Sequence, residues 1–170
     1  MELSISRRTL AVVGIVLGLG ITGYALFGGR SDEEKIRALL DHLAEVAGVS
    51  GTENPVMRAG RLRGAFADIF TKDVRVQIPE LSSLKSGREG LVALATQAGT
   101  AFRSAEISLG SVEITLIASG QAARVRCTAT LVGDRGQGLR KDERSVRFGL
   151  SKDDGDWRID SVSVSAAEED

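Results

Sequence analysis

Four segments in the second half of the chain alternate apolar and polar residues, and this pattern limits the fold more than any other. They lie at about residues 105–117, 125–131, 146–150 and 157–164. Alternation with a period of two is typical of a β-strand that buries one face. Because turns and a loop separate the segments, the sequence predicts an antiparallel meander with one apolar face. Its other face, rich in Arg, Thr and Ser, is expected to face solvent or a partner.

Two of the predicted strands change phase along their length. In the first strand the apolar positions shift at Gly110-Ser111, and in the last strand they shift between Ile159 and Val162. One extra residue in a strand returns the apolar side chains that follow it to the same face, so a β-bulge or bend is predicted in both strands. A loop is expected at Gly133–Lys141, between the second and third strands of the meander.

Three helices and a short strand are predicted before the meander. Ser31 and Ser86 each precede a glutamate by three positions, which is a capping box, and Pro55 can open the helix between them. The expected core-facing residues are Ile36, Leu39, Leu40, Leu43, Val46 and Ala47, then Leu62, Ala65, Phe66 and Ile69, then Leu91, Leu94, Ala95, Ala98 and Phe102. Arg58, Arg61 and Arg63 are expected to lie off the second stripe. The short strand is predicted at residues 72–78, and helices followed by strands indicate an α+β fold.

The N-terminal segment carries no charged residue from Thr9 through Gly29, a run of 21 residues. About 20 helical residues cross the hydrocarbon core of a bilayer. The sequence therefore predicts a short tail and a single transmembrane helix over residues 1–30, followed by a folded domain over 31–170. A cleaved signal peptide is the alternative, with Gly23-Tyr24-Ala25 as the cleavage site, but the run is longer than the usual signal core.

The short tail before the span favours a protein of the bacterial cytoplasmic membrane with its domain outside the cytoplasm. Lys and Arg residues flank both ends of the span, so their count does not fix the orientation. Gly14 and Gly18 match the small-residue spacing at which membrane helices pack together, although glycine is common in membrane helices anyway. Gly18–Gly23 also fits a dinucleotide-binding pattern, but no strand and turn precede it.

Composition excludes several classes of function. The chain has 22 Lys and Arg against 23 Asp and Glu, and 4% aromatic residues, which argues against nucleic acid as a partner. Cys127 is the single cysteine, so no intrachain disulfide can form, and it is expected to be a small core residue. No spacing of His, Cys and carboxylates indicates a metal site, and no cofactor is predicted.

The order of elements resembles the nuclear transport factor 2-like cone, the fold of SnoaL-like cyclases and ketosteroid isomerase. The resemblance rests on the stretches FADIFTKDV (66–74), SGREGL (86–91) and DGDWRI (154–159). It implies an α+β cone of three helices packed on a curved, mainly antiparallel sheet, with a pocket between them. The residues that could line this pocket, or simply fill the core, are Phe66, Phe70, Phe102, Cys127, Phe148 and Trp157.

Acid–base residues are scarce in the predicted domain. Enzymes of the resembled families place an Asp, His or Tyr in the pocket, but Tyr24, the only tyrosine, lies in the predicted span. The weak catalytic candidates are His42, at the flank of the first helix stripe, and Asp68, at the end of the second helix. Both are expected at the surface, so no catalytic residue is assigned.

Three hypotheses of function follow from the sequence. The first is a membrane-anchored, non-catalytic module for protein interaction or assembly at the bacterial envelope. Its layout is similar to that of the periplasmic scaffold of type IV secretion and of membrane proteins associated with lipid-uptake systems. The second is a binder of a small hydrophobic ligand, and the third is a SnoaL-like isomerase or cyclase. The resemblance also suggests a homodimer formed through the outer face of the sheet. On that face Arg124, Arg126 and Arg147 could form a basic strip, with Glu113 and Glu143 as opposite charges on neighbouring strands.

Overall fold

The structure, a computed structural model, describes residues 29–51, 53–79 and 87–166. The predicted transmembrane span, with Gly14 and Gly18, lies outside these residues except for its last position. Within the described ranges, no helix is both long and apolar enough to cross a bilayer. From Glu33 onward the chain forms one compact unit.

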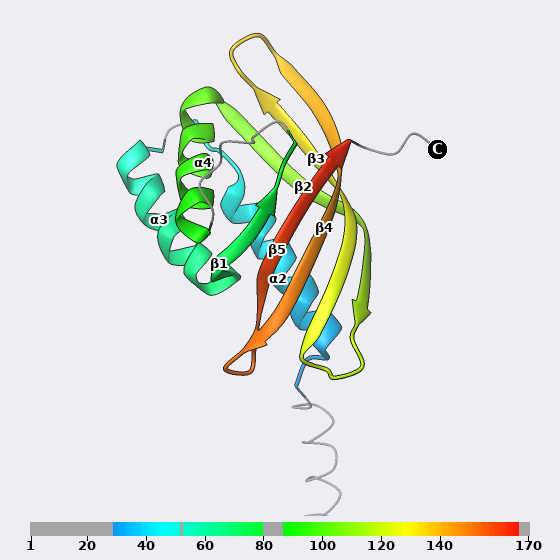
Figure 1. Ribbon diagram of the computed structural model, residues 1–170. Coiled ribbons are helices and arrows are strands. Elements are labelled where there is room, and N and C mark those ends of the chain that lie inside the picture. Colours follow the sequence, from blue (N-terminus) through cyan, green and yellow to red (C-terminus); the bar gives the residue numbers. More distant parts are fainter. Residues whose placement is uncertain (1–28, 52, 80–86, 167–170) are drawn as a thin grey trace, which may run out of the picture. The chain divides into compact units, whose positions relative to one another are not determined.

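A five-stranded sheet with the order β1-β5-β4-β3-β2 forms this unit (Figure 1). The strands are β1 (Phe70–Gln77), β2 (Ser104–Leu116), β3 (Ala122–Asp134), β4 (Leu139–Asp153) and β5 (Asp156–Ala166). Strands β2 to β5 pair antiparallel in chain order, which confirms the predicted meander. Strand β1 adds to β5 in the parallel direction, so the last strand of the chain is not an edge strand.

Three helices precede or interrupt the sheet, as predicted: α2 (Asp32–Ala47), α3 (Pro55–Ile69) and α4 (Arg88–Ala101). Helix α3 begins where Asn54 accepts a hydrogen bond from the Val56 backbone nitrogen at 2.8 Å. Helix α4 has Gly87 at its N-cap position, with a positive φ of 82°. The predicted N-cap, Ser86, lies outside the described residues.

Both predicted bulges are present in the sheet. The pairing of β2 with β3 shifts between Gly110 and Glu113, where Ser111 has a φ of 50°. In β5, Asp160 is the extra residue, because Ile159 pairs with Leu150 and Ser161 pairs with Gly149. Each bulge moves the apolar side chains that follow it back to the inner face of the sheet.

The loop predicted at Gly133–Lys141 is shorter than expected. Strand β3 continues to Asp134 and β4 begins at Leu139. The Asp134 carboxylate accepts hydrogen bonds from the Gly136 and Gly138 backbone nitrogens at 2.6 and 3.1 Å. Both glycines have a positive φ, which lets the chain turn tightly and extends the hairpin.

The core lies between the inner face of the sheet and the helices. Ile36 and Leu40 of α2 are at most 1% exposed, and they belong to one apolar cluster with Val125, Phe148 and Ile159 of the sheet. Helices α3 and α4 pack against each other and against β1. The α+β cone of three helices on a mainly antiparallel sheet is therefore confirmed.

Candidate functional site

An open cleft with a volume of about 930 Å³ lies between helix α2, helix α3 and strand β2. We call it the α2–β2 cleft. Its walls are mainly apolar, whereas its rim is charged. The apolar wall residues are Ala44, Val46, Val49, Ala65, Ala105, Ile107 and Leu109, and the charged rim residues are Asp41, Glu45, Glu53 and Arg61.

The cleft lies where α2 runs beside β2, and a hydrogen bond of 3.4 Å from Arg37 to the Val112 carbonyl oxygen joins the two elements beyond Leu109. Ile107 and Leu109 lie on the same face of β2 as the buried Ala105, yet they are only partly buried. The loop after α2 closes one end, because Val49 and Ala105 exchange two backbone hydrogen bonds of 2.7 and 2.9 Å. An apolar surface in a hollow of this size is a usual property of small-molecule sites.

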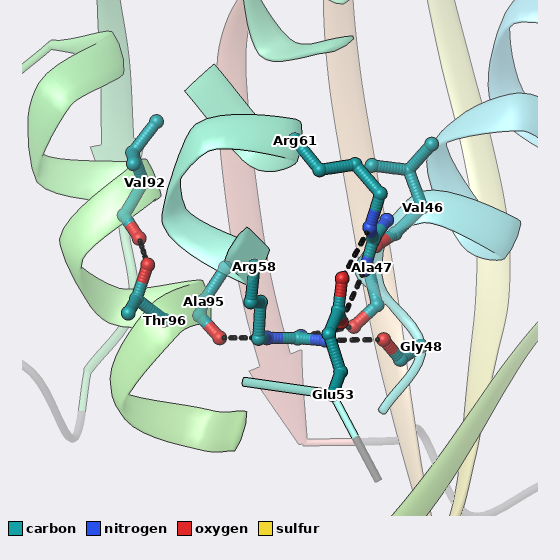
Figure 2. Close-up of polar contacts among 9 residues, drawn as sticks. All are labelled: Val46, Ala47, Gly48, Glu53, Arg58, Arg61, Val92, Ala95 and Thr96. Carbon is teal, nitrogen blue, oxygen red and sulfur yellow. Dashed lines mark hydrogen bonds and ion pairs between the residues drawn. The ribbon is translucent and has the colours of Figure 1, made fainter. Parts of the chain in front are cut away.

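Two arginines of α3 hold the end of α2 beside the cleft (Figure 2). Arg58 donates to the carbonyl oxygens of Ala47 at 3.2 Å and Gly48 at 2.8 Å. It also donates to the carbonyl oxygen of Ala95 in α4 at 3.1 Å. Arg61 donates to the carbonyl oxygen of Val46 at 3.1 Å. The last carbonyls of a helix have no partner within the helix, so the two guanidinium groups cap α2 at its C-terminus.

Glu53 completes this arrangement from the loop before α3. Its carboxylate receives hydrogen bonds from Arg61 at 2.7 and 2.8 Å and from Arg58 Nη1 at 3.3 Å. The bonds from Arg61 are the main reason that the pKa of Glu53 falls to about 2, with the charges of both arginines adding to the effect and desolvation opposing it. We call Glu53, Arg58 and Arg61 the arginine cap.

We expect the arginine cap to contribute less to the free energy of unfolding in acid. A carboxyl group with a lowered pKa stabilises the folded state above its unfolded pKa, near 4.5, and this contribution is lost as the pH falls toward 2. With allowance for solvent screening, the effect is about 1 to 2 kcal/mol. Urea unfolding of wild type and Glu53→Gln at pH 7 and at pH 2.5 measures it. The difference in unfolding free energy between the two proteins should shrink at pH 2.5, and a difference that is the same at both pH values would contradict the assignment.

Arg58 is the buried charge that the sequence prediction placed wrongly. It was expected off the apolar stripe of α3, but it is 2% exposed and continues that stripe one helical step before Leu62 and Phe66. The spacing of four between positions 58, 62 and 66 was the available signal. An arginine is rarely buried without partners, and the partners of Arg58 come from other elements of the fold.

The two weak catalytic candidates lie around one shallow hollow of about 410 Å³, together with Lys35, Trp157 and Arg158. His42 also borders the α2–β2 cleft, but half of its side chain is exposed, and its closest acidic partner is Glu45 at 3.9 Å. Asp68 is exposed, as predicted. Both side chains are exposed to solvent, and neither lies in an enclosed pocket.

The six predicted pocket residues do not line a common hollow. Phe66, Phe70, Cys127, Phe148 and Trp157 are 3–6% exposed and belong to the apolar core cluster, which fits the alternative that they fill the core. Phe102 lies outside that cluster, under the Arg135 guanidinium at 4.5 Å. Each of the five surface hollows contains at most one of the six residues.

Cys127 has no catalytic environment. Burial raises the pKa of its thiol to about 11, so it stays protonated at neutral pH, and the thiol is a poor nucleophile. Among the described residues, no group of three or more His, Cys, Asp and Glu side chains could hold a metal ion.

Comparison with known proteins identifies the type of domain. A family model described as a SnoaL-like domain matches residues 58–163. No curated protein is similar enough in sequence to match the chain.

Several solved structures share the fold. One is an NTF2-like protein with a cystatin-like fold from Novosphingobium aromaticivorans, with a TM-score of 0.65 and 16% identity over 98% of this chain and 94% of that chain. Another, from the same organism, is provisionally described as a scytalone dehydratase, with a TM-score of 0.54 and 18% identity over 86% of this chain and 89% of that chain. A third is a protein of unknown function from Mycobacterium tuberculosis, with a TM-score of 0.61 and 17% identity over 79% of this chain and 76% of that chain. At such low identities the similarity shows a shared fold and by itself says nothing about activity.

Proposed function

The chain belongs to the SnoaL-like domain family, and from this premise we propose that its domain binds a small apolar ligand in the α2–β2 cleft. The observation that carries the proposal is the cleft itself, which leaves Ile107 and Leu109 of the inner sheet face only partly covered. The large side chains that could have lined an interior pocket are buried in the core instead. A ligand would therefore enter at the β2 end of the sheet and not in the centre of the cone.

The charge of the rim restricts the class of ligand. Three carboxylates, those of Asp41, Glu45 and Glu53, border the cleft, against the single guanidinium of Arg61. Arg61 and Glu53 pair with each other, so the excess negative charge of the rim comes from Asp41 and Glu45. This excess of negative charge favours a neutral or cationic apolar molecule and disfavours fatty acids and other apolar anions.

Catalysis is not part of this proposal. His42 and Asp68 are the residues that a SnoaL-like isomerase or cyclase would have to use, and both are solvent-exposed at the edge of a shallow hollow. The relative described as a dehydratase is similar in fold alone. A binding role requires only the apolar walls and the rim charges that are present.

We expect residues 31–170 to bind decyltrimethylammonium more tightly than decanoate, by about fivefold or more. One favourable charge contact near the surface contributes about 1 kcal/mol. Isothermal titration calorimetry, with each ligand kept below its critical micelle concentration, measures both affinities. Ala65→Leu, which fills the cleft, should weaken binding at least tenfold.

Ala59→Leu is the matched control for this experiment. Ala59 is also a partly buried residue of α3, but it borders a different hollow, with Arg63 and Glu89. The control should leave both affinities within twofold of wild type. Decanoate binding as tightly as the cation, or an Ala65→Leu variant that binds normally, would overturn the proposal.

The second candidate function is the interaction or assembly module expected from the sequence, anchored in the bacterial cytoplasmic membrane by residues 9–29. Its anchor is a proposal that rests on the hydropathy of those residues alone. The observation that favours an interaction role is the outer face of the sheet, which the helices leave uncovered and on which Arg75, Arg124, Arg126 and Arg147 are exposed. The two candidates use opposite faces of the sheet, so one protein can carry out both.

A further inference from the structure

The outer face of the sheet contains a shallow groove of about 710 Å³ that crosses all five strands. The strand registers arrange its side chains in two neighbouring rows. One row runs through Arg75, Ser161, Gly149 and Arg124, and the other through Ser163, Arg147, Arg126 and Glu113. We call this hollow the arginine groove.

In one row, two like charges are direct neighbours. Arg126 of β3 and Arg147 of β4 are register partners, so their side chains leave the sheet side by side. Like charges that are directly opposite destabilise a sheet. Glu113 pairs with Arg126 at 3.6 Å, which leaves the charge of Arg147 unanswered in this row. The predicted second acid, Glu143, pairs instead with Lys141 at 2.7 Å.

In the other row, two arginines flank a hollow. Ser161 and Gly149 separate Arg75 from Arg124, and a Cβ at Gly149 would collide with the Ser161 hydroxyl oxygen. Asp160, the extra residue of the β5 bulge, pairs with Arg75 at 3.6 Å. Among the described residues, Arg124 and Arg147 form no ion pair. The groove therefore has four guanidinium groups and two carboxylates.

We propose that the arginine groove binds an acidic, extended segment of a partner protein. This inference rests on the second candidate function and names the chemistry of its partner. Arg124 and Arg126 are two residues apart on β3, about 6.8 Å along the strand. Carboxylates on alternate residues of an extended peptide have the same spacing. Each can form a two-pronged hydrogen bond with a guanidinium group.

Other occupants fit the groove less well. A second copy of this face, related by a two-fold axis, would bring the same excess of arginines against it, and like charges that meet across an interface cost several kcal/mol. Nucleic acid would meet a molecule with a net charge of -1 and no aromatic side chain on the outward rows of this face. A single small anion would use a small part of a groove that spans five strands.

The test is fluorescence anisotropy of a labelled eight-residue peptide that alternates aspartate and glycine, mixed with the full-length chain in a non-ionic detergent. The matching asparagine–glycine peptide is the neutral probe. We expect the acidic peptide alone to bind, and to bind more weakly at 300 mM than at 50 mM NaCl. The double variant Arg124→Gln/Arg147→Gln should lose at least tenfold in affinity. Arg63→Gln, an exposed arginine of α3 outside the groove, should bind as wild type does.

Three results would overturn the inference. Equal binding of the acidic and neutral peptides, or full affinity in the double variant, would mean that these arginines do not recognise carboxylates. Absence of peptide binding combined with a dimer that Arg147→Glu dissociates would also overturn it. That last outcome would leave the interaction function standing, with a second copy of the chain as the partner.

Discussion

Replacing Arg58 with alanine is expected to lower the free energy of unfolding by about 3 to 5 kcal/mol. The substitution leaves the carbonyl oxygens of Ala47 and Gly48, at the end of α2, without the Arg58 donor, and each buried unsatisfied group costs about 1 to 3 kcal/mol. It also empties the space of a side chain that is 2% exposed. Water that enters the space recovers part of the loss. Urea unfolding followed by circular dichroism measures the change.

Arg63→Ala is the control, because Arg63 belongs to the same helix but is 63% exposed. Its ion pair with Glu89, at 3.7 Å, is a surface contact. Such pairs contribute about 0 to 1 kcal/mol, so this variant should unfold close to wild type. If both variants lost the same stability, the arginine cap would not be a structural support of α2.

Gly99 offers an independent test of the same contact. A Cβ at Gly99 would lie 2.6 Å from Arg58 Cδ, so the arginine side chain passes α4 where a side chain is missing. Gly99→Ala should therefore destabilise the wild-type protein. In the Arg58→Ala background the same change should be neutral or stabilising, because alanine favours a helix over glycine by about 1 kcal/mol. The two effects together form a double-mutant cycle.

The meander was predictable from sequence because a strand with one buried face must alternate its residues. The phase changes at Gly110-Ser111 and before Val162 located both bulges for the same reason. The parallel pairing of β1 with β5 left no such signal. Which strand lies beside which depends on how the chain crosses between them, and the residues of β1 alone do not determine it.

The candidate sites were harder to predict because their residues come from distant elements. The α2–β2 cleft depends on how α2 packs beside β2, which the residue types of the two elements do not specify. Alternation alone predicted that Arg124, Arg126 and Arg147 share the outer face of the sheet, and they do. Their alignment in rows with Arg75 and Gly149 follows from the registers of four strand pairs, which the sequence does not specify.

Replacing Phe66 with alanine is expected to cost about 3 to 5 kcal/mol and to leave ligand binding in the α2–β2 cleft unchanged. Phe66 is 3% exposed, its ring packs edge-on against Phe70 with centroids 5.0 Å apart, and it is absent from the cleft lining. Removing a buried aromatic side chain leaves a cavity that a packed core fills poorly. Urea unfolding gives the stability, and titration with decyltrimethylammonium gives the affinity of the folded variant.

Phe102→Ala separates core packing from a general effect of losing an aromatic ring. Phe102 is partly exposed and lies outside the apolar core cluster, against Arg135, so its removal should cost less than about 2 kcal/mol. A Phe66→Ala variant that stays within about 1 kcal/mol of wild type but binds the cation differently would mean that Phe66 lines a ligand pocket. The interior of the cone would then be the binding site, and the α2–β2 cleft would be its entrance. Loss of stability with unchanged affinity would place recognition in the cleft and leave the aromatic core to hold the sheet and helices together.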